Sequence, residues 1–190
     1  MSESLTTRLE QAHHAFKQKR YESAFDMYEA LSNDGHAESQ VFLAWMYTEG
    51  LGCTADIHEA DKLYERAAAL GNPVGTFYRA RWLTKNGEHE KAFGLYQVAA
   101  KAQHLPSIFR VGYSFSRGAG VGPNLDKAYD SLRKAAAQGH ILAMREIAVL
   151  DLAGQRGSFN RLLSPFRFLT MLIRGFFLQA VDRHSDRLRA

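Results

Sequence analysis

The sequence predicts an all-α protein built from repeated pairs of helices. Alanine, leucine, glutamate, lysine and arginine dominate the middle of the chain, and these residues favour helix. Four prolines and few runs of Val, Ile or Thr argue against a β-rich fold. The hydrophobic fraction of 46% and the charged fraction of 23% are ordinary for a folded chain of 190 residues, which argues against disorder. The third observation is an internal repeat.

Two stretches, 37–72 and 105–140, repeat each other at an offset of 68 positions. Paired alanines let two helices approach closely, and glycines supply the backbone angles of tight links and helix ends. We therefore expect each stretch to form two antiparallel helices joined by a short loop. The matched small residues are Gly50 with Gly118, Gly52 with Gly120, Ala60 with Ala128, Ala67 and Ala68 with Ala135 and Ala136, and Gly71 with Gly139.

Less regular units surround these copies. Residues 73–104 form a shorter copy, in which a tight turn replaces the Gly-x-Gly loop and accounts for a deficit of four residues. Residues 1–36 are expected to form an N-terminal hairpin, and residues 141–190 a last pair of helices. The expected helices lie near 4–18, 21–33, 37–49, 57–70, 74–85, 88–102, 106–117, 125–138, 141–153 and 160–181.

The motifs of the two regular copies resemble Sel-1-like repeats. Leu43 to Gly52 reads L-A-x-M-Y-x-x-G-x-G, and Val111 to Val121 reads V-G-x-x-F-x-x-G-x-G-V. The shorter copy and the N-terminal unit are more similar to tetratricopeptide repeats. Cys53 and Ala44 depart from the usual Val and Gly of the family. The resemblance implies a right-handed α-solenoid that acts as a protein-binding adaptor, often in bacterial signalling, envelope or secretion systems, and it implies no enzymatic activity.

The first helix of each unit is expected to line a concave groove that binds a partner. Residues four apart share one side of a helix, and Trp, Tyr and Arg carry much of the energy of interfaces. The candidate groove residues, at equivalent positions of three units, are Val41 and Trp45, Phe77 and Arg81, and Phe109 and Tyr113. Phe77 and Phe109 also fit a core position. An arginine at the position of Trp45 favours the surface, because arginine is seldom buried.

Residues 159–181 are more apolar than any other expected helix and contain five phenylalanines. Arg167 and Arg174 interrupt the apolar run, which argues against a transmembrane span. Two alternatives remain. The segment buries its apolar side by capping the array or pairing with a second copy, or it lies in the plane of an anionic membrane. The candidate interface residues are Phe166, Arg167, Leu169, Arg174, Phe176 and Phe177.

Charge separates the body from the tail. Residues 155–190 hold seven arginines against two aspartates, a net charge of +5, whereas the first 154 residues carry a net charge of −1. A basic, apolar tail suits anionic lipid or an acidic partner. We expect no nucleic-acid binding, because large apolar runs separate the arginines. The N-terminus has no apolar run of signal-peptide length, so a cytoplasmic protein, peripheral to the inner membrane through its tail, is expected.

No motif points to catalysis, a metal or a cofactor. A single cysteine, Cys53, excludes an internal disulfide and a multi-cysteine zinc site. His36, His104 and His140 recur at repeat ends, and we interpret them as caps of helix C-termini. No P-loop, H-E-x-x-H or dinucleotide fingerprint is present. We therefore expect a non-enzymatic adaptor without a cofactor. The alternative is an accessory enzyme or metal-binding protein that uses histidines and acids of several repeats.

Overall fold

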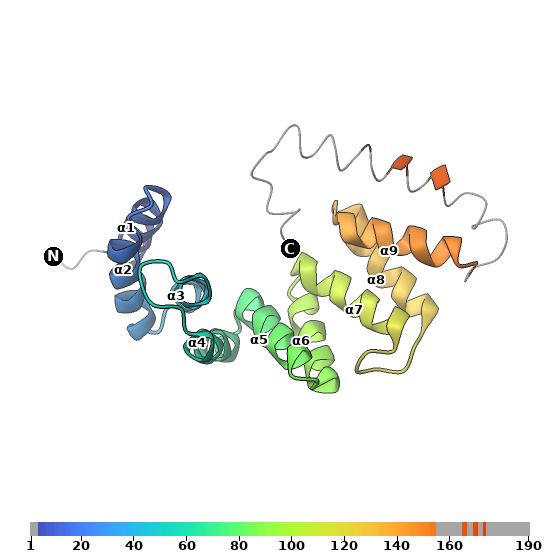
Figure 1. The fold of residues 1–190 in the computed structure, drawn as a ribbon, viewed down its shortest axis with the longest axis horizontal. Helices are drawn as coiled ribbons and strands as arrows, with labels where there is room; N and C mark the ends of the chain where they lie inside the picture. The colour runs from blue at the N-terminus through green and yellow to red at the C-terminus, as the bar shows by residue number, and fades with distance from the viewer. Residues whose placement is uncertain (1–3, 155–164, 167–168, 171–172, 174–190) are drawn as a thin grey trace. The chain divides into compact units, whose positions relative to one another are not determined.

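The computed structural model describes residues 4–154, 165–166, 169–170 and 173, and those residues form α-helices and no strand. The helix bounds expected from the sequence are confirmed to within one residue up to residue 154. The last expected helix spans residues 160–181. Residues 165–166, 169–170 and 173 of it are described and are helical, and its other residues lie outside the described part. The helices are α1 Leu5–Lys17, α2 Tyr21–Asn33, α3 Ala37–Glu49, α4 Ile57–Ala69, α5 Pro73–Lys85, α6 His89–Lys101, α7 Leu105–Arg117, α8 Leu125–Ala137 and α9 Ile141–Leu152 (Figure 1).

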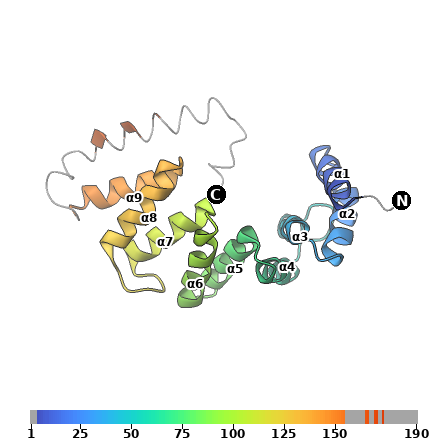
Figure 2. The same ribbon diagram turned by 180° about the vertical axis from the view of Figure 1, so that it is seen from behind.

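The chain divides into two compact units, Met1–Gly87 and Glu88–Ala190. The first contains α1 to α5, and the second contains α6 to α9. Within each unit consecutive helices pack against each other (Figure 1 and Figure 2). The first helices of neighbouring pairs also touch, α3 with α5 and α7 with α9. We call α1, α3, α5, α7 and α9 the A helices, and the intervening ones the B helices. The observed fold confirms the predicted all-α solenoid of helix pairs.

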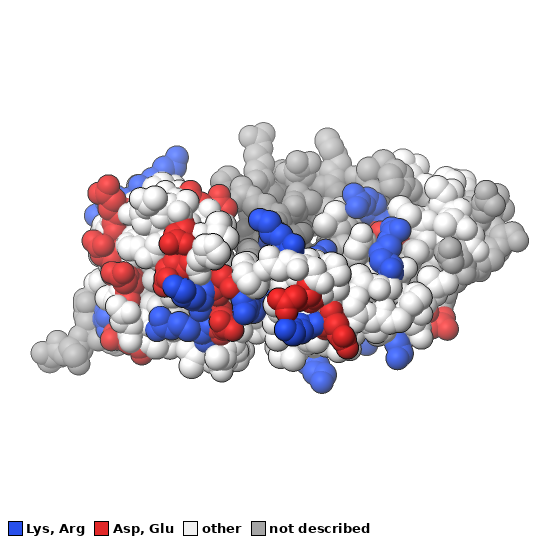
Figure 3. Space-filling view, turned by 60° about the horizontal axis from the view of Figure 1, so that its bottom comes forward, with Lys and Arg blue, Asp and Glu red and all other residues white. Residues whose placement is uncertain are grey.

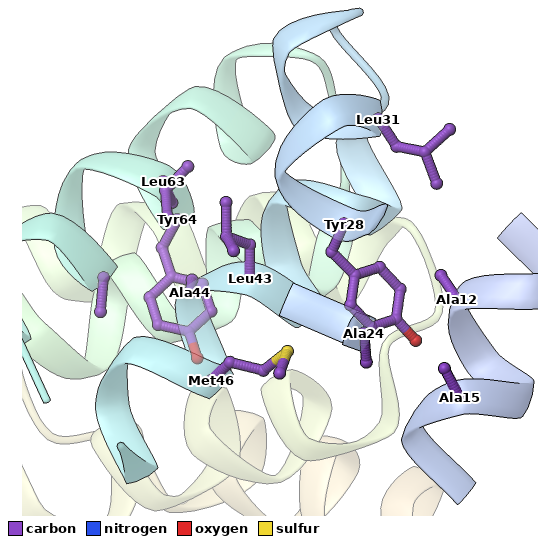
Figure 4. Close-up of a cluster of buried hydrophobic side chains, with 11 residues drawn as sticks. Ala12, Ala15, Ala24, Tyr28, Leu31, Leu43, Ala44, Met46, Leu63 and Tyr64 are labelled. Atoms are coloured by element: carbon purple, nitrogen blue, oxygen red, sulfur yellow. The ribbon is translucent and has the colours of Figure 1, made fainter. Parts of the chain in front are cut away.

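Small side chains let the helices approach closely. Ala67, Ala99 and Ala135, the first alanines of the three repeated pairs, are all buried. An added Cβ at Gly75 of α5 would lie 2.6 Å from the Cβ of Ala67 on α4, so these two helices touch almost backbone to backbone. In the first unit, alanines of α1 and α2 surround the ring of Tyr28, which is fully buried (Figure 4). The predicted role of the alanines is confirmed at these positions.

The two long loops, 50–56 and 118–124, are built alike. The backbone N–H of Leu51 donates to a carbonyl of the preceding helix, and the N–H of Ala119 donates to the equivalent carbonyl 68 positions later. The backbone N–H groups of Asp56 and Asn124 form a second pair of equivalent bonds at the same offset. Gly50 and Gly118 end α3 and α7 in the left-handed conformation. The loop 86–88 has three residues where the long loops have seven. This difference confirms that the shorter copy loses its four residues in the loop between its helices.

The second glycine of each long loop allows a close approach between backbones. An added Cβ at Gly52 would lie 2.4 Å from the carbonyl oxygen of Tyr21, and one at Gly120 would lie 2.0 Å from that of His89. Both distances are far below van der Waals contact. Each long loop therefore rests on the first residue of the preceding B helix. The sequence indicated the unusual backbone angles of these glycines but not this contact.

The interpretation of the repeat-end histidines is wrong for their side chains. His36, His104 and His140 are the N-cap residues of the next A helix, α3, α7 and α9. Nδ1 of His36 accepts a hydrogen bond from the backbone N–H of Ser39, and Nδ1 of His140 accepts one from Ala143, each at 3.3 Å. Asn72, at the equivalent position, caps α5 through its amide oxygen.

The backbone of the same residues closes the preceding helix. The N–H of His36 donates to the carbonyl of Leu31, that of His104 to Ala99, and that of His140 to Ala135. This is the backbone bond of a glycine-containing C-terminal cap, because Gly35 and Gly139 precede two of the histidines with positive φ. One residue thus serves both ends of a junction. In His36 and His140 the imidazole accepts a hydrogen bond at the start of the next helix and does not cap the C-terminus of the preceding one.

Candidate partner-binding faces

The A helices of the first unit place two predicted residues at the surface and bury one. Arg81 of α5 is exposed, and Trp45 of α3 is half-buried, its ring 5.2 Å from that of Phe16. Phe77 is only 7% exposed, so its ring belongs to the core and offers almost no surface to a partner. Val41 is half-buried and packs against the core of the first unit. Among the predicted groove residues of this unit, Trp45 and Arg81 therefore offer surface to a partner, and Val41 lies partly in the core.

Ion pairs and rings fix the orientation of α5. Arg79 bonds to Asp61 and, at 3.1 Å, to Glu65, both on α4. Its guanidinium also lies 4.7 Å from the centre of the Trp82 ring. These contacts hold one side of α5 against α4. The neighbouring Arg81 is exposed, and its guanidinium lies 5.5 Å from the centre of the Tyr78 ring.

The second unit places an aromatic pair among arginines. Phe109 and Tyr113 of α7 are half-buried, with ring centres 5.9 Å apart. The guanidinium of Arg110 lies 5.9 Å from the Tyr113 ring, and that of Arg117 lies 5.5 Å from it. Arg117 also donates to the carboxylate of Glu146 on α9 at 2.9 Å. Tyr113 thus presents its ring between two cations.

The same helical stripe continues onto α9, where sequence reasoning did not follow it. Arg145 and Val149 lie 36 positions after Phe109 and Tyr113, the spacing that relates the first helices of neighbouring full-length units. Both are exposed, Val149 to 41%. The repeat offset was the signal that could have found them. The fifth unit lacks the paired alanines and the glycine that end units 37–72 and 105–140, which makes its equivalence harder to detect in the sequence.

Two of the six candidate residues in the C-terminal segment are described. Phe166 is 67% exposed and Leu169 is 54% exposed, and Ile173, on the same side of a helix, is 60% exposed. Arg167, Arg174, Phe176 and Phe177 lie outside the described residues. Among the helices of the described part, none is both long enough and apolar enough to span a membrane.

The described residues hold no cluster of three or more His, Cys, Asp or Glu side chains that could bind a metal ion. Cys53 is half-buried, and its thiol lies 3.7 Å from the carbonyl oxygen of Met46. Burial raises the pKa of this thiol. A raised pKa keeps sulfur in the unreactive thiol form at neutral pH.

The sequence profile of the Sel1 repeat matches this chain three times, at residues 37–72, 78–104 and 105–140. The matches cover more than half of the chain; the first and third contain the pairs α3–α4 and α7–α8, and the middle one begins within α5 and contains α6. The chain belongs to the Sel1 repeat family. The middle match lies within the shorter copy, so the Sel1 profile also covers the unit expected to be more similar to a tetratricopeptide repeat.

Solved Sel1 repeat structures share the fold. A Sel1 repeat protein from Oxalobacter formigenes superimposes with a TM-score of 0.76 at 21% identity, covering 87% of this chain and 70% of that one. The antigen c5321 of uropathogenic Escherichia coli, which displays an SLR fold, gives a TM-score of 0.80 at 20% identity, covering 90% of this chain and 38% of that one. At these identities the likeness concerns the fold alone.

The curated relatives that this chain matches are much longer proteins. Protein SHC1 of Saccharomyces cerevisiae is 29% identical over 106 residues, which is 53% of this chain and 20% of that protein. Chitin synthase regulatory factor 3 of Schizosaccharomyces pombe is 36% identical over 84 residues, which is 44% of this chain and 9% of that protein. The chain therefore spans a fifth or less of the length of these relatives.

Proposed function

We propose that this Sel1 repeat protein is a non-catalytic scaffold that binds a peptide or helix of a partner protein on the faces of its A helices. The observation that carries the proposal is that Trp45, Arg81 and Tyr113, at equivalent positions of three repeats, all reach the surface, Arg81 as an exposed residue and the two aromatic residues as half-buried ones. A buried structural position would not accept tryptophan, arginine and tyrosine in turn. A surface that anchors a partner favours these three residue types.

The relatives support a regulatory role. Two of them are named as regulators of chitin synthase, in Schizosaccharomyces pombe and in Saccharomyces cerevisiae. Binding to a protein is a direct way to regulate an enzyme, and this chain is similar to a part of each of these regulators. We carry over the class of function, protein-to-protein binding in a regulatory assembly, and not the particular target.

Capture of partners from native cells tests the proposal. The full chain is immobilised, and the proteins that it retains are compared with those retained by the double variant Arg81→Ala and Tyr113→Ala. We expect the variant to lose specific partners while its melting temperature stays the same. The matched control replaces Arg66 and Val98, exposed residues of the B helices α4 and α6, by alanine and should retain them.

Two results would contradict the proposed role of these residues. A large fall in the melting temperature of the double variant would show that they are core residues. Unchanged capture by a stable double variant would show that partners bind elsewhere on the chain.

A second candidate function is attachment to an anionic membrane through the C-terminal segment. The observation in its favour is the exposure of Phe166, Leu169 and Ile173 on one side of a helix, within a tail of net charge +5. Amphipathic basic helices bind anionic lipid surfaces in this manner. Flotation with vesicles that contain phosphatidylserine should recover the full chain, and replacement of these three residues by aspartate should abolish recovery. Equal recovery with neutral vesicles would contradict electrostatic binding.

A further inference from the structure

The last described A helix exposes a stripe of aliphatic side chains with an arginine between them. Leu142, Val149 and Leu152 of α9 are 37%, 41% and 57% exposed, and Arg145 is exposed beside them. Their spacings of three, four and three put all four on one side of the helix. Terminal repeats of helical arrays normally carry a polar outer face, and a contiguous exposed apolar patch marks an interaction surface.

The solvent-exposed charges of the two A helices that form this face, α7 and α9, are of one sign. Helix α7, which packs beside α9, contains arginines and no Asp or Glu. Helix α9 has two acids, and both are buried: Glu146 is 3% exposed and bonded to Arg117, and Asp151 is 1% exposed and bonded to Tyr129. Neither A helix of the second unit therefore presents a carboxylate to solvent.

The cations of this face remain available. Arg117 and Arg145 are exposed, and within the described part of the chain Arg145 has no hydrogen bond or ion pair. Residues 88–154 as a whole hold eight Lys and Arg against six Asp and Glu, whereas residues 1–87 hold nine against twelve. Figure 3 shows most of the acidic side chains of the visible face over the first unit. The face of α7 and α9 is thus apolar at its centre and positive around it.

A second copy of the chain fits this face poorly. If two α9 stripes packed against each other, two arginines would enter one apolar interface without a carboxylate, and an unpaired buried charge is strongly destabilising. The chain's own segment 155–190, with a net charge of +5, also brings mainly positive charge. A partner that carries carboxylates among aliphatic side chains satisfies both features of the face.

We infer that α7 and α9 bind an acidic amphipathic helix of the partner protein. Aliphatic side chains of that helix, spaced i, i+3 or i+4, and i+7, pack on Leu142, Val149 and Leu152. A carboxylate between them pairs with Arg145, and a second one reaches Arg117, whose guanidinium has more donors than Glu146 uses. This inference rests on the proposed function and adds the chemical class of the partner and the location of one contact surface.

Selection from a displayed library of helical peptides tests the inference. The full chain is the bait, and the peptide sequences are randomised at every position. We expect the enriched peptides to be net negative and to carry aliphatic residues at the spacing given above. A synthetic copy of the most enriched peptide should lose affinity about tenfold or more with Arg145→Glu and with Val149→Asp. Lys134→Glu and Val98→Asp, exposed changes on the B helices α8 and α6, serve as matched controls and should bind normally.

A charge reversal provides a further arm. The same synthetic peptide with lysine in place of its glutamates should bind Arg145→Glu better than it binds the unaltered chain. Enrichment of neutral or basic peptides, or equal affinity of acidic peptides for Arg145→Glu, would overturn the inference while the scaffold function stands. Failure to enrich any peptide, together with cell capture that is insensitive to Arg81 and Tyr113, would count against the scaffold function itself.

Discussion

The imidazole of His140 lies nearly flat on the ring of Phe109, with ring centres 4.6 Å apart and an angle of 20° between the planes. His140 is 1% exposed, closes α8 through its backbone N–H and caps α9 through Nδ1. Phe109 therefore packs on the cap of the next A helix, which gives it a structural role besides any contact with a partner. The junction requires a neutral imidazole, because a protonated Nδ1 could not accept the hydrogen bond of the cap.

The histidine caps predict loss of stability in mild acid. Burial lowers the pKa of His104 to about 4 and also lowers the pKa of His140. Between the ordinary histidine pKa of about 6.5 and these lowered values, the unfolded chain binds more protons than the folded chain. The free energy of unfolding should therefore fall as the pH drops from about 6.5 to about 4, with about 3 kcal/mol or less from His104 and a further loss in the same direction from His140. Urea denaturation at a series of pH values measures this.

Asparagine supplies the control for the pH experiment, because Asn72 already caps α5 at the equivalent position. The double variant His104→Asn and His140→Asn should lose most of the pH dependence between about 4 and 6.5, while asparagine at position 140 can still cap α9 through its side-chain oxygen. If the wild-type chain and this variant showed the same slope, the acid sensitivity would have to come from other groups.

Gly120→Ala should be strongly destabilising. The residue has φ of +74°, and an added Cβ would overlap the carbonyl oxygen of His89, so the loop would have to leave α6. The backbone conformation alone costs about 1–3 kcal/mol for a residue with a side chain, and the clash adds to it. Thermal unfolding measures the loss.

Gly122→Ala is the matched control for that substitution, since an added Cβ there meets nothing within 4 Å. We expect its melting temperature to stay close to that of the wild-type chain. A Gly120→Ala variant as stable as Gly122→Ala would show that the loop does not rest on α6 in solution.

The repeat offset predicted the helices well, because small residues at fixed spacing determine where helices end and touch. It did not reveal the double role of His36 and His140, because a residue between two helices with a three-residue link belongs to both ends. The spacing of four residues placed Phe77 and Arg81 on one stripe of α5 but did not show that Phe77 is buried and Arg81 exposed. Neighbours on one stripe can differ in burial, and burial depends on the adjacent helices rather than on the stripe itself.

Phe77→Ala and Arg81→Ala should therefore differ sharply in stability, although both lie on α5. Phe77 is a buried ring, and its truncation should cost about 3–5 kcal/mol through lost burial and a cavity. Arg81 is exposed, and its truncation should change the free energy of unfolding by less than about 0.5 kcal/mol. Chemical denaturation of the two variants compares them directly. Similar losses for both would place Arg81 in the core and remove it from the binding face.

A buried hydrogen bond between α8 and α9 supports the helix that carries the inferred binding site for an acidic helix. The hydroxyl of Tyr129 donates to a carboxylate oxygen of Asp151 at 2.7 Å, and both side chains are buried. Tyr129→Phe removes a hydrogen bond to a charged group and should cost about 1.5–3 kcal/mol. Tyr113→Phe, on the half-buried face of α7, should cost much less. Hydrogen exchange should locate the loss, with faster exchange of α9 amides in Tyr129→Phe only; unaltered α9 protection would mean that this bond does not hold the helix in place.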